Sequence, residues 1–194
     1  MNLQDTVSIV TGSSSGVGAA TARMLVQKGS RVVINFSRSV DAAQKVAEEC
    51  ESLGGEVMLC QADVSLDADC RRMVDVAMTK WGRLDVLVNN AGTTKFVQHP
   101  DLDGLTSEDF QHIYGVNVVG PFQMVRAASD ALKASGNAAI VNVASIAGVK
   151  GVGSSIAYAA SKGALITMGK SLARVMGPEV RVNTVCPGFI TGDW

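Results

Sequence analysis

The chain has 194 residues, of which 47% are hydrophobic and 18% are charged, and this balance suits a compact α/β domain and excludes a disordered chain. The formal net charge of −1 gives no indication of nucleic acid or of an anionic membrane as a partner. No apolar run in the sequence reaches the roughly 18 residues that a membrane-spanning helix needs.

Short β-branched runs alternate along the chain with longer amphipathic segments. This pattern predicts strands at residues 6–11, 31–36, 57–61, 84–89, 138–144 and 180–186. It predicts helices at residues 16–28, 40–53, 67–81, 107–135 and 155–176. We expect the helix at 107–135 to consist of two pieces, divided near Gly115 or Gly120-Pro121, and residues 93–105 to form a loop.

Strands that alternate with helices indicate βαβ units and a parallel sheet. The strands are nearly continuous apolar runs, as in strands covered on both faces. Right-handed crossovers favour a doubly wound, Rossmann-like sheet of order 3-2-1-4-5-6 in three α/β/α layers, and we expect one domain over residues 1–194. Ligands of such sheets bind beyond the carboxyl ends of the strands, so the residues after each strand are the candidates.

The N-terminus and the cysteines favour a cytoplasmic protein. Residues 1–5 lead almost directly into a predicted strand, so we expect no signal peptide. The four cysteines form no CxxC pair, and Cys60 and Cys186 fall in predicted buried strands. We therefore expect four reduced thiols and no metal site, although the even count leaves disulfides as the alternative; the cysteines are Cys50, Cys60, Cys70 and Cys186.

A turn rich in glycine and serine, residues 11–18, joins the first strand to the first helix. Its glycines allow a pyrophosphate to approach the backbone, and the helix N-terminus offers free N–H groups and the positive end of a dipole. The spacing is GxxxGxG, whereas GxGxxG is commoner. The alternative is a turn without a ligand, but the position after the first strand favours a dinucleotide.

The segment after the second strand bears on the choice of cofactor. Residues 35–39, Asn-Phe-Ser-Arg-Ser, contain no acidic residue to bind the ribose hydroxyls of NAD. The guanidinium of Arg38 can bind a 2′-phosphate by charge-assisted hydrogen bonds. We therefore predict that NADP(H) is preferred, with NAD(H) use as the alternative; Arg38 as a merely solvated charge is the plainer interpretation.

Polar residues also follow the third and fourth strands. Asp63, which precedes Val64, can accept a hydrogen bond from the adenine amine or cap the next helix, a role for which Ser65 and Asp67 compete. The fourth strand closes on Asn-Asn-Ala-Gly at residues 89–92, and its amides and small residues suit packing against a flat ring or a ribose. A tight turn is the alternative for this segment.

Tyr158 and Lys162 are four positions apart in a predicted helix and therefore share one face. A phenol has an ordinary pKa of about 10, and a neighbouring ammonium stabilises the phenolate, so we expect Lys162 to lower the pKa of Tyr158. Ser145 stands just past the fifth strand, where its hydroxyl can bond a substrate carbonyl. Asn117 lies within a predicted helix and can extend a proton path. A chance tyrosine–lysine pair is the alternative.

Together these residues resemble the short-chain dehydrogenase/reductase family in its compact single-domain form. The matching motifs, in chain order, are TGxxxGxG at 11–18, NNAG at 89–92, Asn117, Ser145, YxxxK at 158–162 and Pro187-Gly188. The resemblance implies an NAD(P)-dependent oxidoreductase that interconverts a ketone and a secondary alcohol. Residues 35–39 are similar to the corresponding loop of beta-ketoacyl-acyl carrier protein reductases, which favour NADPH, so a 3-oxoacyl thioester is a candidate substrate.

The resemblance also implies roles for individual residues. Tyr158 would be the general acid in reduction and the base in oxidation, and Lys162 would bond the nicotinamide ribose and tune Tyr158. Ser145 would orient and polarise the carbonyl, and Asn117 would hold a water in a proton relay. The expected cofactor contacts, besides Tyr158 and Lys162, are Gly12, Ser14, Ser15, Gly16, Val17, Gly18, Arg38, Asp63, Val64, Asn90, Ala91, Gly92, Pro187, Gly188 and Ile190.

The sequence departs from the family pattern in two places. Many NADP-preferring members have a basic residue where this chain has Ser15, so Arg38 would carry the 2′-phosphate largely alone and dual cofactor use stays open. Family members also continue with a substrate lid, another helix and a seventh strand, and this chain stops at residues 191–194, where the lid begins. Either the molecule is truncated or a further tail follows, and we favour the tail because no motif is degraded.

Other interpretations concern turnover and assembly. A cofactor-binding sensor without turnover is the main rival, but it needs no proton donor such as Tyr158. The epimerase branch has another glycine spacing and a larger C-terminal domain. The helices at 107–135 and 155–176 carry apolar residues on more than one face, which predicts a homodimer or homotetramer. Residues 93–105 and 146–154 are expected to govern which substrate binds.

Overall fold

A computed structural model describes residues 1–191 of the chain. It contains one six-stranded sheet in the order β3-β2-β1-β4-β5-β6, with every neighbouring pair parallel. The strands are β1 (Val7–Val10), β2 (Arg31–Phe36), β3 (Val57–Gln61), β4 (Val86–Asn89), β5 (Ala138–Val143) and β6 (Val180–Val185). The predicted fold class and strand order are confirmed.

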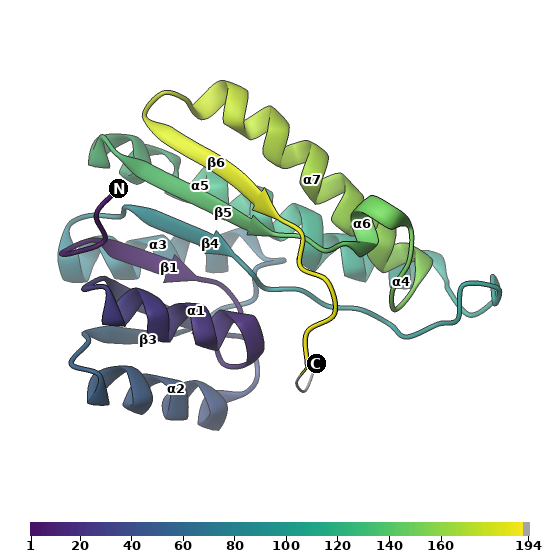
Figure 1. The fold of residues 1–194 in the computed structure, drawn as a ribbon, viewed down its shortest axis with the longest axis horizontal. Helices are drawn as coiled ribbons and strands as arrows, with labels where there is room; N and C mark the ends of the chain where they lie inside the picture. The colour runs from purple at the N-terminus through teal and green to yellow at the C-terminus, as the bar shows by residue number, and fades with distance from the viewer. Residues whose placement is uncertain (192–194) are drawn as a thin grey trace.

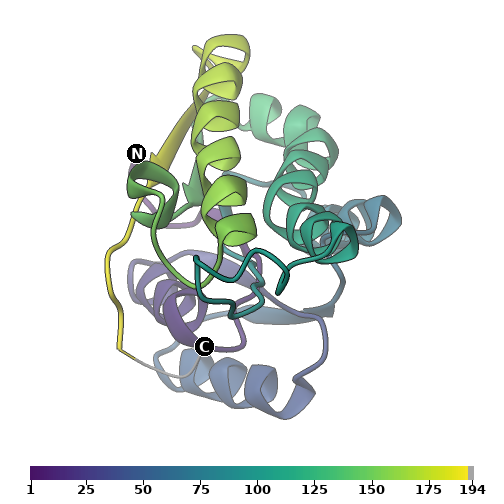
Figure 2. The same cartoon turned by 90° about the vertical axis from the view of Figure 1, so that its right-hand side faces the viewer.

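Helices cover both faces of the sheet (Figures 1 and 2). One face packs against α1 (Gly16–Gln27) and α2 (Val40–Ser52). The other packs against α3 (Asp67–Trp81), α5 (Gly120–Ser135) and α7 (Ile156–Met176). Successive β2 residues face opposite layers: Val33 belongs to the core under α3, α5 and α7, and Ile34 to the core under α1 and α2.

The predicted division of residues 107–135 takes an unexpected form. Three elements follow one another without a loop: α4 (Ser107–Tyr114), the π-helix η1 (Gly115–Val119) and α5. In η1 the N–H of Gly120 donates to the carbonyl oxygen of Gly115, five residues back. Pro121 falls in the first turn of α5 and has no N–H with which to continue the hydrogen-bond ladder from η1. A short helix, α6 (Ala147–Lys150), was not predicted.

Asp85 connects several elements at the amino ends of the strands, the end of the sheet opposite to the candidate site. The residue is 1% exposed, and its carboxylate accepts hydrogen bonds from the Val7 N–H over 2.8 Å, the Ser135 hydroxyl over 2.6 Å and the Arg83 guanidinium over 2.7 Å. Burial by itself would raise the pKa of Asp85, but the bonds from Arg83, Ser135 and Val7 outweigh it, so the pKa is lowered. One carboxylate thus joins β1, the start of β4 and the end of α5.

The edge strand β6 and the cysteine that follows it differ from the expectations. Burial on both faces is confirmed for β1 and β4 but is wrong for β6, an edge strand in which Arg181 and Asn183 are exposed. Cys186 is half-buried and follows β6, outside the strand that was predicted to contain it. All four cysteines are free. Within residues 1–191, none of the helices has the length and apolar character needed to span a bilayer.

Candidate active site

The turn after β1 is closely packed on the side of Ala91 and open at Gly16. Gly12 and Gly16 have φ angles of 61° and 53°, which side-chain-bearing residues rarely adopt. A Cβ at Gly12 would lie 2.8 Å from the Cα of Ala91, and one at Gly18 would collide with the carbonyl oxygen of Gly12. A Cβ at Gly16 would meet nothing within 4 Å. The turn therefore packs closely on β4 and leaves room for a ligand at the start of α1.

Side chains from neighbouring strands hold this turn in place. Thr11 Oγ1 accepts hydrogen bonds from the backbone N–H groups of Asn90 and Ala91 over 2.9 and 3.0 Å. Asn90 Nδ2 donates to the carbonyl oxygens of Thr11 and Gly12 over 2.9 and 3.0 Å. Asn35 Oδ1, from β2, accepts from the Gly12 N–H over 2.9 Å. Both amide hydrogens of Asn90 are thus used within the protein, and an adenosine contact would use its other atoms.

Asn35 supports the turn that holds Gly12, and the sequence-based predictions missed this role. Its side chain is 2% exposed, and Nδ2 also donates to the carbonyl oxygens of Cys60 and Ala62 over 3.2 and 3.0 Å. One amide therefore connects the turn to the end of β3. The available signal was a polar residue near the end of an otherwise apolar strand, Arg31–Phe36.

The N-terminus of α1 faces the open side of the turn. Ser15 is the N-cap residue, in an extended conformation with φ −156°, and within the described chain its side chain makes no capping hydrogen bond. The first N–H groups of α1, at Val17 and Gly18, have no intrahelical acceptor. Such groups, with the helix dipole, form an anion-binding position.

The predicted adenosine end lies after β2 and β3. Arg38 is exposed just beyond β2, and Val64 is buried. Asp63 Oδ1 accepts hydrogen bonds from the backbone N–H and the hydroxyl of Ser65 over 2.9 and 2.7 Å. The N-cap of α3 is Leu66, and none of the described side chains caps that helix, so the capping alternative for Asp63, Ser65 and Asp67 is wrong.

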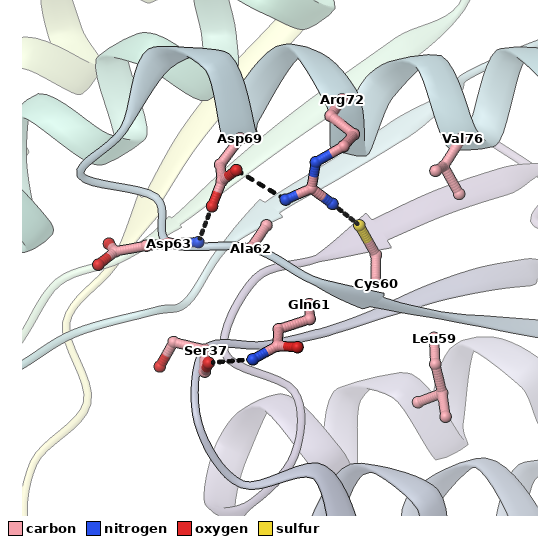
Figure 3. A pocket seen from close by; sticks show the side chains of 9 residues that line it. All are labelled: Ser37, Leu59, Cys60, Gln61, Ala62, Asp63, Asp69, Arg72 and Val76. Atoms are coloured by element: carbon pink, nitrogen blue, oxygen red, sulfur yellow. Dashed lines mark hydrogen bonds and ion pairs between the residues drawn. The ribbon is translucent and has the colours of Figure 1, made fainter.

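A hollow of about 490 Å³ lies beside the adenosine end, at the edge strand β3 (Figure 3). Figure 3 shows Arg72 between Asp69 and Cys60, with 2.6 Å from Nη2 to the carboxylate and 3.7 Å from Nη1 to the sulfur. Asp69 also accepts a hydrogen bond from the Asp63 N–H over 2.7 Å. Because β3 is the opposite edge of the sheet from β6, this hollow is separate from the residues on β5 and α7.

The structure brings three predicted catalytic residues together at the end of β5 and the start of α7. Tyr158 is hydrogen-bonded to Ser145 and is 8% exposed. Lys162 is 3% exposed; its Nζ lies 5.6 Å from the centroid of the Tyr158 ring and donates to the carbonyl oxygen of Val143 over 2.9 Å. A Cβ at Gly92 would lie 3.5 Å from Lys162 Nζ, so the segment after β4 borders the same group.

The expected effect of Lys162 on Tyr158 is wrong for the free chain. Burial raises the pKa of Tyr158, and the hydrogen bond with Ser145 opposes this shift without reversing it. Burial also lowers the pKa of Lys162 to about 8. Removal from water disfavours both the phenolate and the ammonium, and the Lys162 hydrogen bond goes to Val143. The spacing in the sequence correctly predicts that Lys162 lies near Tyr158, but it does not predict the direction in which the pKa of Tyr158 moves.

Asn117 lies in η1 and is fully buried. Its Oδ1 accepts from the Thr93 N–H over 2.8 Å, while Nδ2 donates to the Thr93 carbonyl oxygen over 2.9 Å and to Ser161 Oγ over 3.0 Å. The Ser161 hydroxyl donates to the carbonyl oxygen of Tyr158 over 2.7 Å. Asn117 thus ties the segment after β4 to α7, and its amide hydrogens are already in use. A water would have to bond its remaining lone pair or its backbone.

The segment after β6 completes the set of predicted positions. The Pro187 carbonyl oxygen accepts from the Ile146 N–H over 2.9 Å, which places it beside the residue after Ser145. A Cβ at Gly188 would meet nothing within 4 Å, and Ile190 is 53% exposed. From β6 the segment runs toward α1 (Figures 1 and 2). Most of the predicted start of the lid, residues 192–194, lies outside the described residues.

A family model described as short chain dehydrogenase matches residues 6–194. The chain belongs to the short-chain dehydrogenase/reductase family. It is 47% identical over 188 residues to a ketoacyl reductase assigned to the granaticin polyketide synthase of Streptomyces violaceoruber, a match that covers 97% of this chain and 74% of the relative. It is 36% identical to a 3-oxoacyl-[acyl-carrier-protein] reductase of Synechocystis, over 96% of this chain and 75% of the relative.

Solved structures of short-chain dehydrogenases/reductases share the fold closely. A crystal structure from Burkholderia xenovorans described as such an enzyme has a TM-score of 0.93 and 44% identity, over 95% of this chain and 77% of the other. NAD⁺-bound xylitol dehydrogenase has a TM-score of 0.92 and 30% identity, over 100% of this chain and 74% of the other. The chain is therefore an NAD(P)-dependent oxidoreductase of this family.

The residues present fit a nicotinamide dinucleotide. The open space above Gly16, together with the free N–H groups of Val17 and Gly18, suits a pyrophosphate. Beside the segment after β4, the buried ammonium of Lys162 can donate further hydrogen bonds to ribose hydroxyls near Gly92. The N–H groups at the start of α1 thus suit an anionic ligand, and the Lys162 ammonium suits hydroxyl groups. A nicotinamide dinucleotide carries both kinds of group.

Proposed function

We propose that this short-chain dehydrogenase/reductase interconverts a ketone and a secondary alcohol with NADP(H) as the preferred cofactor. The observation that carries the proposal is the meeting of Ser145, Tyr158 and Lys162, with the Ser145–Tyr158 hydrogen bond at its centre. The nicotinamide ring, when bound, supplies or accepts the hydride. Side chains of the protein bind and orient the ketone and transfer the proton.

In reduction, Tyr158 donates the phenol proton to the oxygen of the substrate carbonyl, and the Ser145 hydroxyl donates a hydrogen bond to that same oxygen. The raised pKa of Tyr158 keeps the phenol protonated at neutral pH, which suits a proton donor. In oxidation, the Tyr158 phenolate accepts the alcohol proton. We assign Asn117 to holding a water through which the phenol regains its proton.

The preference for NADP(H) rests on the end of β2. Arg38 is exposed there with no acidic residue in positions 35–39, so a 2′-phosphate would meet a cation and no repelling carboxylate. Ser15 adds no second cation at the phosphate turn. We therefore expect a preference for NADPH and measurable use of NADH.

The ketone substrate is proposed to be a 3-oxoacyl thioester or a ketone of similar bulk. Two relatives carry names of this kind, a ketoacyl reductase and a 3-oxoacyl-[acyl-carrier-protein] reductase. Gly153 lies in the segment before α7 and leaves this border of the Tyr158 ring without a side chain, since a Cβ there would lie 3.7 Å from Tyr158 Cδ1. A bulky or thioester-linked ketone suits such a border.

We further propose that the chain assembles through α5 and α7 into a homodimer, alone or within a tetramer. A hollow of about 480 Å³ lies between these helices. Phe122 and Val175 line it and are 44% and 72% exposed. Two copies that place these helices against each other would remove this apolar surface from water.

The deciding experiment follows absorbance at the reduced-nicotinamide band with NADPH and NADH in parallel, against a ketone panel that includes a 3-oxoacyl thioester. Consumption that is faster with NADPH supports the reaction and the assignment of Arg38. The variant Arg38→Ala should reduce the NADPH preference while leaving NADH-dependent rates within about twofold, since the lost contact is specific to the 2′-phosphate. Binding of NADPH without consumption on any ketone would contradict the proposal.

A further inference from the structure

A pair of hydroxyls joins the loop after β4 to the segment that precedes α7 and its Tyr158. Thr94 Oγ1 and Ser154 Oγ lie 2.6 Å apart in a partly buried position. The backbone N–H of Val97 donates to the carbonyl oxygen of Ser154 over 2.9 Å. Residues 93–105 follow β4 and residues 151–155 precede α7, so these contacts connect parts of the chain that are 60 positions apart.

Ser154 stands between two residues that lie beside Tyr158. Gly153 has φ 112°, and a Cβ built there would lie 3.7 Å from Tyr158 Cδ1 and 3.1 Å from Ala147 Cβ. Ser155 is the fully buried N-cap of α7 and accepts a hydrogen bond from the Tyr158 N–H over 3.2 Å. The position of Ser154 therefore affects both the backbone beside the ring and the start of the helix that carries the phenol.

The loop on the other side of the hydroxyl pair has attachments of its own. The Thr93 backbone is held by the Asn117 amide through two hydrogen bonds. Lys95 Nζ forms a 2.6 Å ion pair with Asp109 at the start of α4. Loss of the hydroxyl pair would leave these contacts in place. It would change mainly the relation between the loop and residues 151–155.

We propose that Thr94 and Ser154 are specificity-determining positioning residues: their hydrogen bond holds residues 151–155 beside the Tyr158 ring and limits the size of the ketone that reaches the phenol. The inference rests on the proposed function of Tyr158. Gly151 and Gly153, with φ 68° and 112°, make this segment easy to displace once the bond is lost. Neither hydroxyl exchanges a proton with the substrate.

Hydrogen exchange in the free chain tests the coupling between the segments. Thr94→Val and Ser154→Ala should each speed exchange of the peptide that contains the Val97 N–H by about fivefold or more, because local opening becomes easier. Thr94→Ser keeps a hydroxyl and should keep the slow exchange. Ser52→Ala, which removes an exposed hydroxyl bonded to Glu49 at the end of α2, serves as the control. Unchanged exchange in both Thr94→Val and Ser154→Ala overturns the coupling.

Kinetics with NADPH test the effect on specificity. The ratio of kcat/KM for 2-tetralone to that for cyclohexanone should rise about tenfold in Thr94→Val and in Ser154→Ala, and no further in the double variant, because both changes remove one shared bond. The KM for NADPH should stay as in the wild type. An unchanged ratio, or additive effects of the two substitutions, overturns the specificity role.

The two measurements separate this inference from the function on which it rests. If the wild type reduces neither ketone nor any other member of the panel, the proposed function fails and the specificity role falls with it. Hydrogen exchange still decides in that case whether the hydroxyl pair joins the two segments, because it needs neither cofactor nor substrate.

Discussion

The ammonium of Lys162 lies 5.6 Å from the centre of the Tyr158 ring, one helical turn along α7. Both side chains are buried, and burial moves their pKa values in opposite directions, up for Tyr158 and down to about 8 for Lys162. Each shift favours the uncharged form of its group. The free chain therefore holds a protonated phenol beside a cation that is readily neutralised, an arrangement suited to donating a proton.

The first prediction concerns the phenol. Tyr158→Phe should reduce turnover by roughly 10²- to 10⁴-fold, the usual contribution of a positioned general acid. Binding of NADPH, measured by its fluorescence, should stay within about twofold because the ring remains in place. Tyr114→Phe, at the other tyrosine of the chain, is the matched control. Turnover that survives Tyr158→Phe would exclude Tyr158 as the proton donor.

The second prediction concerns the buried ammonium. The pKa of Lys162 in the folded chain, about 8, is below its ordinary value of 10.5, so the unfolded chain binds more protons between these values. The contribution of Lys162 to stability must therefore rise as pH increases through this window. Unfolding by urea at pH 7 and pH 9.5 should show the wild type gaining stability relative to Lys162→Met by about 1 kcal/mol or more. A constant difference between the two would show that Lys162 keeps its ordinary pKa.

A third prediction follows from Asp85. Asp85→Asn should lower the free energy of unfolding by about 1–3 kcal/mol, because the amide has no charge to pair with Arg83 and only one acceptor oxygen for the donors that the two carboxylate oxygens now bind. The exposed Asp75 provides the control, and Asp75→Asn should change stability by less than about 0.5 kcal/mol. The pKa of Asp85 is lowered, so its contribution is present above the ordinary carboxyl range and is lost in acid. The gap between wild type and Asp85→Asn should therefore narrow below about pH 4.

Two helical glycines give a fourth prediction, with opposite signs. A Cβ at Gly169 would collide with Thr184 Oγ1 and lie 3.2 Å from Asn142 Nδ2, so Gly169→Ala should cost about 1–3 kcal/mol of stability. A Cβ at Gly115 would meet only Ser65 Cβ, at 3.9 Å, so Gly115→Ala should be neutral or stabilise by up to about 1 kcal/mol. Thermal unfolding compares the two, and equal effects would contradict the close approach of α7 to β6.

The fifth prediction addresses assembly. Val175→Asp places a carboxylate on the hollow between α5 and α7, and burying an unpaired charge in a dimer contact is unfavourable. Sedimentation velocity at micromolar concentration should show an oligomer for the wild type and a monomer for Val175→Asp. Val40→Asp, at an exposed position that starts α2, should leave the assembly unchanged. A monomeric wild type would remove the proposed contact altogether.

The strand order could be predicted from the handedness of crossovers, and the approach of Lys162 to Tyr158 from their spacing in one helix. Alternating strands and helices have few right-handed arrangements, and Tyr158 and Lys162 share a helix face by periodicity alone. The support given by Asn35 to Gly12, and by Val143 to Lys162, could not be predicted in this way. Those contacts join residues 23 and 19 positions apart; the first depends on the register between β1 and β2, and the second on how α7 packs on β5. The direction of the Tyr158 shift likewise depends on burial, which spacing does not reveal.

The π-helix η1 fixes the phase between the two halves of one long helical rod. Each residue of an α-helix advances the side-chain direction by about 100°, so the extra residue in residues 115–119 rotates α5 relative to α4. Removing one residue would restore a regular helix but turn either Asn117 away from Thr93 or Met124 and Leu132 out of the core. A single-residue deletion here would therefore rotate one half of the rod out of its packing, and a compensating insertion nearby would be needed to restore both sets of contacts.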